Sequence, residues 1–402
     1  MRKIIVLVFI CLLTIIAGQV WALDLNYLRE NREVLAEEPG FELLLPGLEG
    51  KKMILAGEAH GVGINSELAL ELLTFLHGEA DVRYFLWEGG YALGSMINSY
   101  IQEGEAELLD LVFTQLEGTV FWSKEQYLFF NNLAEFNAEL PPEKRVEVIG
   151  IDLELPLTSS IIFLDFLLGD EVPESLKPLQ QLAVNHKMLV GPSQLYSSRV
   201  RLETFQMAVY IQEIIESEGE NLQELLGEDW FAFEYGLERL IQTHETWGEG
   251  FQVREDFAFS NLLELSPHLD RGNFFGQWGG NHVLQRNQAR VNWLGSLLQG
   301  PRSPWADQVL SIYYVYDHCK RMDPRTYQAR DYSSQEIRDL EVLRRAAPAD
   351  ICLFWLGAPG SPFTEEIHFL TGHSRGVTTD YFQYLIMIRN QSASTPLRKA
   401  ED

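Results

Sequence analysis

Short apolar runs that end in glycine or a polar residue alternate along this chain with segments of helical spacing. Met53-Ile54-Leu55-Ala56-Gly57 is the first such run, and leucines then recur at helical spacing from Ser66 to His77. Val82 to Trp87 is a second run, after which Leu93 to Gln102 returns to the helical pattern. A short apolar run predicts a buried strand, whereas recurrence every three or four residues predicts a helix. Strands that alternate with helices predict an α/β fold, with a largely parallel or mixed sheet flanked by helices.

The same alternation continues in the rest of the chain. Arg145 to Ile151 predicts a third strand, and Asn273 to Trp278 predicts a fourth. Later apolar runs that we also predict as strands are Val309 to Val315, Ile351 to Trp355 and Tyr384 to Ile388.

Residues 156–268 have a different composition. They are rich in Leu, Gln and Glu and show few strand signals, while Leu202 to Glu216 and Trp230 to His244 have helical periodicity with polar opposite faces. A chain of 402 residues also exceeds what one small core usually holds. We therefore expect one elaborated α/β domain over residues 23–402, with a helical insertion at about 156–268.

The first 22 residues have the layout of a secretory signal peptide. Arg2 and Lys3 precede an apolar run from Ile4 to Ala17, and Val20 and Ala22 supply short side chains before a cleavage site. The alternative is an uncleaved membrane anchor, but the run is shorter than the roughly 20 residues that a spanning helix needs. We expect residues 1–22 to be removed. The mature protein would then be extracytoplasmic, periplasmic or secreted, with no membrane association.

Charge and cysteine content exclude several classes of partner and site. Lys and Arg total 31 against 58 Asp and Glu, a formal net charge of −27, and this field repels nucleic acid. Once the signal peptide is removed, Cys319 and Cys352 remain, too few for a disulfide framework or a Cys-based zinc site. A bridge between them is open, but Cys352 lies in an apolar run and fits a small buried hydrophobe better.

Polar residues follow four of the predicted strands. Glu58 and His60 follow the first, Glu88 the second, Asp152 the third and His282 the fourth. In open α/β sheets ligands bind beyond the carboxyl ends of the strands, so we expect these side chains to gather at one edge. In an extended segment Glu58 and His60 would also point the same way. A carboxylate beside a histidine fixes its tautomer and raises its basicity, so the set suits general acid–base catalysis.

Each of these residues also has a structural interpretation. A lone histidine at a strand end is more often structural, and Asp152 could cap the next helix or bond a loop amide. Glycines beside His60, Glu88 and His282 favour a site, because they allow backbone or ligand to approach closely. We expect no cofactor and no metal ligands, with a divalent metal or haem at His60, Glu88 and His282 left open.

Four residues are candidate substrate contacts: Asp152, Arg254, Trp122 and His373. Trp122 and Arg254 could line a cleft, although an aromatic after Phe121 could be core and a helical arginine a solvated charge. His373 lies in a glycine-flanked loop that could reach a site. The sequence has no HExxH pair and no phosphate-binding Gly-Lys loop, which removes the zincin and P-loop interpretations. We expect a non-covalent mechanism.

Four motifs together resemble the erythromycin esterase-like family, within the superfamily that also includes haem-binding ChaN-like proteins. They are ILAGEAHG, YFLWEGGYALGSMINSYIQEG, VEVIGIDLE and FFGQWGGNHV, in the family's order, and TTDYFQYLIMIRNQSASTPL is similar to the family's end. The resemblance covers about Met53 to Leu397. The family commonly has two residues between its first Glu and His, where this chain has only Ala59. The family's segment that ends in its last histidine also commonly reads His-Asn-x-His. In this chain the segment reads Gly279-Gly280-Asn281-His282, so two glycines replace the family's His-Asn pair.

The resemblance implies an α/β core with helical elaboration and hydrolysis of a cyclic ester by water. His60 would activate the water, Glu58 and Glu88 would orient it or the imidazole, and His282 would polarise or protonate the substrate. We expect a carboxylic ester hydrolase that acts on a small-molecule ester or lactone, with its oligomeric state open. The alternatives are a haem- or metal-binding protein without turnover, or a metal-dependent peptidase.

Overall fold

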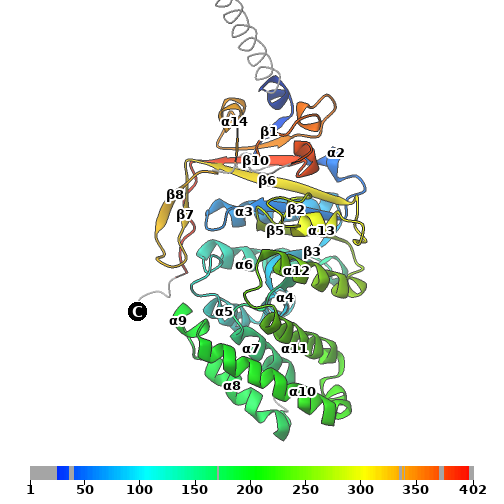
Figure 1. Cartoon of the computed structure of the whole chain (residues 1–402), viewed down its shortest axis with the longest axis vertical. Helices are drawn as coiled ribbons and strands as arrows, with labels where there is room; N and C mark the ends of the chain where they lie inside the picture. Colours follow the sequence, from blue (N-terminus) through cyan, green and yellow to red (C-terminus); the bar gives the residue numbers. More distant parts are fainter. Residues whose placement is uncertain are drawn as a thin grey trace, which may run out of the picture. The chain divides into compact units, whose positions relative to one another are not determined.

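The computed structural model describes residues 25–35, 40–169, 172–334, 337–338, 340–370 and 375–397 (Figure 1). The predicted signal peptide, residues 1–22, and His373 lie outside these ranges. The chain divides into two compact units, which we describe separately. Unit 1 takes in residues 1–59, 279–320 and 331–391, and unit 2 takes in residues 60–278, 321–330 and 392–402.

Unit 1 is built on strands in the order β1-β9-β10-β6-β2. β6 is parallel to both β2 and β10, whereas β9 is antiparallel to its neighbours β10 and β1. Every residue of β6 is buried, which explains why it reads as a nearly continuous apolar run. The bounds are β1 (Arg32–Val34), β2 (Met53–Glu58), β6 (Val309–Asp317), β9 (Ile351–Trp355) and β10 (Tyr384–Arg389).

Short helices and turns join these strands. They are η1 (Glu42–Leu44), α2 (Leu45–Leu48), α13 (Leu294–Leu298), α14 (Leu340–Ala346), η6 (Pro362–Thr364) and η7 (Thr378–Asp380). Cys319 and Cys352 are both buried free thiols. The interpretation of Cys352 as a small buried hydrophobe is therefore confirmed, and no bridge joins the pair.

Unit 2 carries parallel strands in the order β5-β3-β4. Their bounds are β3 (Val82–Gly90), β4 (Glu147–Asp152) and β5 (Asn273–Gly279). The last residue of β5, Gly279, belongs to unit 1. The leucines that gave α3 its helical spacing are buried. Helices that accompany these strands are α3 (Ile64–Glu79), α4 (Tyr91–Glu103), α5 (Ala106–Gln115), α6 (Lys124–Ala138) and the short η2 (Pro142–Lys144). A two-stranded hairpin consists of β7 (Cys319–Met322) and β8 (Ala329–Tyr332), and its tip, residues 321–330, belongs to unit 2.

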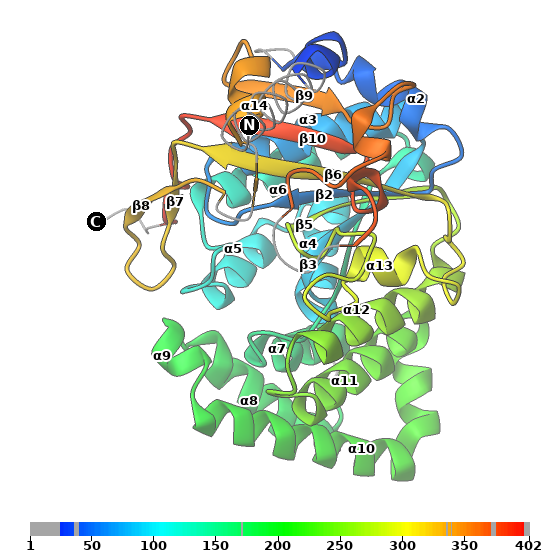
Figure 2. The same cartoon turned by 45° about the horizontal axis from the view of Figure 1, so that its top comes forward.

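Unit 2 also holds a helical segment, in which α7, α8, α10 and α11 lie side by side (Figure 2). Its core contains Ile161, Leu179, Ile211 and Phe233, one from each of these helices. The elements are α7 (Thr158–Leu168), η3 (Glu174–Leu176), α8 (Lys177–Lys187), α9 (Pro192–Leu195), α10 (Ser198–Leu226), η4 (Gly227–Asp229), α11 (Trp230–Glu245), α12 (Phe251–Leu265) and η5 (Ser266–His268).

The α/β fold class is confirmed, with largely parallel strands, flanking helices and a helical segment. Each predicted strand is present, and most begin or end within a few residues of the expected bounds. Over the described ranges, no helix has the length and apolar character needed to cross a membrane.

Candidate functional site

The carboxylate of Glu88 lies near the carboxyl end of β3, inside unit 2. Its side chain is only 4% exposed, so the fold must supply a partner for its charge. Gly90 follows at the start of α4, where a Cβ atom would lie 2.6 Å from Oε2 of Glu154. Glycine is therefore needed at this close approach, and it lets the strand turn into the helix directly after Glu88.

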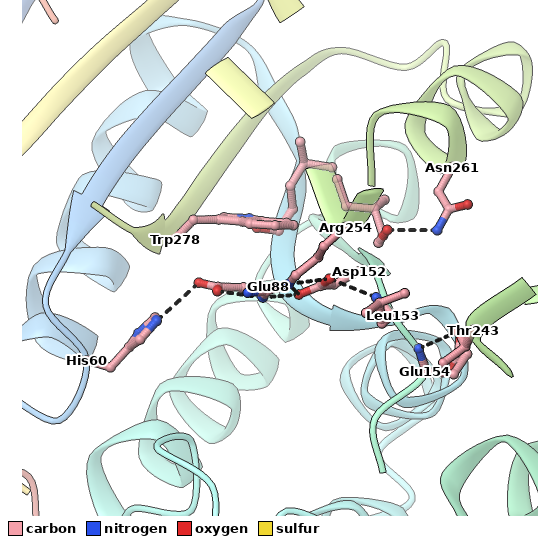
Figure 3. Close-up of polar contacts among 11 residues, drawn as sticks. His60, Glu88, Asp152, Leu153, Glu154, Thr243, Arg254, Asn261 and Trp278 are labelled. Atoms are coloured by element: carbon pink, nitrogen blue, oxygen red, sulfur yellow. Dashed lines mark hydrogen bonds and ion pairs between the residues drawn. The ribbon is translucent and has the colours of Figure 1, made fainter. Parts of the chain in front are cut away.

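Arg254 of α12 is the partner. Its Nη2 atom donates to Oε1 of Glu88 at 2.9 Å, and its Nε atom donates to Oδ1 and Oδ2 of Asp152 at 2.9 and 3.1 Å. Nη2 also contacts Oδ2 of Asp152. The guanidinium thus joins a carboxylate from β3 to a carboxylate from β4 (Figure 3). The planar fork of arginine suits such paired carboxylates better than the point charge of lysine.

The charges within this group stabilise one another. Burial opposes the positive charge of Arg254, but Asp152 and then Glu88 raise the pKa of the guanidinium above its ordinary value. Asp152 is 7% exposed, and its Oδ1 atom also accepts from the backbone N–H of Leu153 at 2.8 Å. The arginine therefore stays charged and offsets the cost of burying two carboxylates.

His60 extends the group into a connected row, Asp152, Arg254, Glu88 and His60 (Figure 3). Its Nε2 atom lies 3.5 Å from Oε2 of Glu88, and its side chain is 27% exposed. A neutral imidazole whose Nε2–H points at a carboxylate has Nδ1 as its acceptor nitrogen. His60 is thus the member of the row that combines solvent exposure with the tautomer a general base needs.

The backbone at His60 differs from the sequence expectation. β2 ends at Glu58, so the extended geometry that would point Glu58 and His60 the same way does not continue to His60. His60 instead begins a turn, in which Gly61 has a φ of +85° and its carbonyl accepts from the backbone N–H of Met322 at 2.8 Å. A Cβ at Gly61 would lie 2.8 Å from the carbonyl oxygen of Met322, so this turn requires glycine.

An aromatic side chain that the sequence did not single out contacts His60. Phe121 meets the imidazole edge-on with ring centroids 5.5 Å apart, and it meets Trp87 in the same way at 5.7 Å. Its neighbour Trp122 packs instead against Tyr327 at the tip of the β7–β8 hairpin, with centroids 5.0 Å apart. Phe121 therefore holds the imidazole, while Trp122 stays a predicted substrate contact.

A further carboxyl group, which the sequence analysis did not single out, belongs to Glu154, two residues after Asp152. Glu154 is completely buried and accepts from the backbone N–H of Ala92 at 3.3 Å and from the hydroxyl of Ser160 at 3.1 Å. Its own backbone N–H donates to Oγ1 of Thr243 at 3.0 Å. Burial raises the pKa of Glu154 to about 7, and the hydrogen bonds only partly offset this rise. Glu154 therefore ties the chain just after Asp152 to α4, α7 and α11.

Glu58 and His282 lie in unit 1, in two adjacent segments. The backbone carbonyl of Glu58 accepts from the N–H of Gly280 at 2.8 Å. The imidazole of His282 is buried, and its ring centroid lies 5.5 Å from that of Trp293. Gly57 permits this arrangement, because a Cβ there would lie 2.5 Å from Cγ2 of Val283. Both residues stay predicted catalytic residues.

The carboxylates of unit 2 fit an arginine better than a metal ion. Both oxygens of Asp152 and one of Glu88 already bind Arg254, whose positive charge stands where a divalent ion would need these ligands. Throughout the described ranges, no three His, Cys, Asp or Glu side chains form a metal-binding group.

Comparisons with known proteins show what the fold is similar to. No protein family model and no curated protein matches the sequence. Among solved structures, a Bacillus cereus protein has a TM-score of 0.66 at 14% identity, over 94% of this chain and 99% of that one. A succinoglycan biosynthesis protein has a TM-score of 0.64 at 14% identity, over the same shares of the two chains.

A mutant of the erythromycin esterase EreC in its open conformation is also similar. Its TM-score is 0.57 at 15% identity, over 88% of this chain and 94% of that chain. At these identities the likeness shows a shared fold and no more. The fold implied by the resemblance to erythromycin esterase-like proteins is therefore confirmed.

Proposed function

We propose that this protein is a hydrolase that cleaves a small-molecule ester or lactone with a water activated by His60, without a metal. The observation that carries the proposal is the row Asp152, Arg254, Glu88 and His60, in which a buried carboxylate bound to an arginine faces Nε2 of a partly exposed histidine. The fold shared with an erythromycin esterase makes an esterase a coherent choice.

The charges of the row support a general base. Asp152 and Glu88 contribute two negative charges and Arg254 one positive charge, so the group carries a net charge of −1 while the imidazole is neutral. Protonation of His60 brings the total to zero, and Glu88 stabilises the imidazolium at 3.5 Å. Arg254 in turn keeps Glu88 ionised, because it favours the charged form of the carboxyl.

The proposed reaction proceeds through a tetrahedral intermediate. Nδ1 of His60 takes a proton from water while the water oxygen forms a bond to the ester carbonyl carbon. The carbon–oxygen bond to the alcohol then breaks, and the imidazolium returns its proton to the departing oxygen. Glu58 and His282 keep the roles that the resemblance implies, orienting the water and polarising the carbonyl.

The test is a panel of model esters and lactones, assayed with the wild type, His60→Ala and His77→Ala. His77 is the matched control, because it is a partly exposed histidine of α3 that contacts the Lys144 carbonyl. We expect His60→Ala to lower kcat/KM by about 10²- to 10⁴-fold, as for loss of a general base. His77→Ala should match the wild type. Turnover that survives His60→Ala would contradict the proposal.

A mechanism with a serine nucleophile is tested by a separate variant at Ser374. Residues 372–376 read Gly-His-Ser-Arg-Gly, the spacing of a serine hydrolase elbow, so the expectation of a non-covalent mechanism has to be tested at Ser374. Ser374→Ala should retain activity if water is the nucleophile. Loss of turnover together with loss of a burst phase would identify Ser374 as an acylated residue and refute the water mechanism.

The binding and peptidase alternatives predict different results. A haem protein would show a Soret band in the purified material, and a metal-dependent peptidase would lose activity on chelation and regain it with added metal. We expect ester turnover that survives chelation. Extracytoplasmic location stays part of the proposal, and N-terminal sequencing of the mature protein tests cleavage after Ala22.

A further inference from the structure

The helical segment of unit 2 contains a cavity of about 210 Å³ that the candidate site does not use. Leu157 and Leu195 line it and are almost completely buried, while Tyr196 and Trp247 line its exposed side. Ser198 and Arg201, both from the first turn of α10, add polar groups. We call this cavity the α10 pocket.

The size and lining of the α10 pocket indicate the shape of its ligand. An apolar cavity of about 150 Å³ accommodates benzene, and pockets for drug-sized ligands run to roughly 300–1,000 Å³. A volume of about 210 Å³ therefore suits a group of one or two fused rings. The flat side chains of Tyr196 and Trp247 beside two leucines favour a planar apolar ring.

The charge of the α10 pocket indicates the second property of the ligand. The guanidinium carbon of Arg201 lies 4.8 Å from the ring centroid of Trp247, and no carboxylate of the described residues pairs with Arg201. By contrast, Arg199 on the same helix binds Glu203 at 2.8 Å. In a chain of net charge −27, a cation in a pocket without an acidic partner favours an anionic ligand. The N-terminus of α10 adds partial positive charge of its own.

We propose that the α10 pocket binds a small anion that carries a planar apolar ring, such as an aromatic carboxylate. The ring lies against Trp247 and Tyr196, and the carboxylate pairs with Arg201 and accepts from Ser198. The binding claim does not depend on catalysis.

The test compares two probes that differ only in charge. Indole-3-acetate and indole-3-acetamide have the same ring, and their binding to the full mature chain is measured by calorimetry or ligand-observed NMR at low salt. We expect the acid to bind at least about tenfold more tightly than the amide, as for a charge-assisted hydrogen bond. Arg201→Gln should remove this difference, and Trp247→Leu should weaken both probes.

Arg199→Gln is the matched control, since it removes a positive charge from the same helix but lies outside the α10 pocket. It should leave the preference for the acid unchanged. The proposal is overturned if the wild type binds acid and amide equally. It is also overturned if neither probe binds at millimolar concentration, or if Arg199→Gln and Arg201→Gln reduce the preference to the same extent. Circular dichroism of each variant separates these results from loss of folding.

Discussion

Replacing Arg254 with glutamine removes the cation that joins two buried carboxylates. In the wild type the guanidinium makes hydrogen bonds of 2.9 Å to Glu88 and of 2.9 and 3.1 Å to Asp152. Arg254→Gln leaves both carboxylates in place, 4% and 7% exposed, with a neutral amide between them. One of them must then take up a proton or remain as an uncompensated buried charge.

The expected cost follows from the burial of the three groups. Breaking a buried ion pair by removing one partner costs about 3–5 kcal/mol. The side chain of Arg254 is itself 29% exposed, so solvent screens part of the interaction and the lower end, about 3 kcal/mol, applies near pH 8. Without the arginine, the two buried carboxylates keep no cation between them.

The assay is denaturant unfolding of both proteins near pH 8, followed by tryptophan fluorescence and by circular dichroism. Arg199→Gln is the control, because its exposed pair with Glu203 should contribute little to stability. Ester turnover by Arg254→Gln should fall along with stability, whereas Arg254→Lys should fold but turn over slowly, because lysine cannot bind Asp152 through a fork. A change below about 1 kcal/mol near pH 8 would refute the view that the row depends on this cation.

Three further predictions concern Glu154, Gly90 and His282. Burial raises the pKa of Glu154 to about 7. The stability that the protonated side chain contributes is therefore fully present below the pKa of the unfolded state, and it is lost as the pH rises through 7. Glu154→Gln should therefore stabilise the fold by up to about 3 kcal/mol near pH 8 and by little near pH 4, as measured by unfolding free energies. Gly90→Ala should place a methyl group against Glu154 and lower the melting temperature by several degrees, and a melting temperature within one degree of the wild type would contradict this. His282→Asn should lower kcat by about 10²-fold at unchanged KM, and an effect confined to KM would assign His282 to substrate binding instead.

The strand ends were the part of the site that the sequence could predict. Apolar runs that terminate in Glu88 and Asp152 are local signals, and the structure brings both carboxylates into the row with His60. The fold class followed from the same signal, because alternation needs no long-range information. β1 was missed because three residues are too few to show a pattern.

The rest of the site depends on tertiary packing. Arg254 was predicted as a candidate substrate contact, but its pairing with Asp152, 102 positions earlier in the chain, is a tertiary contact that its local sequence does not reveal. Phe121 and Trp122 are adjacent aromatics, so sequence alone cannot say which one faces His60. Glu154 stands two residues after Asp152, and its burial results from the packing of α4, α7 and α11, which no local pattern encodes.

The β7–β8 hairpin is fastened beside His60 through main-chain atoms, with the Met322 N–H bound to the Gly61 carbonyl. This hydrogen bond joins main-chain atoms, so it can form with other side chains in the tip, where Tyr327 now packs against Trp122. Under the proposed function, a changed tip would alter which molecules reach His60, while Asp152, Arg254, Glu88 and His60 stay in place. Substrate choice would then change without any change in the residues that activate water.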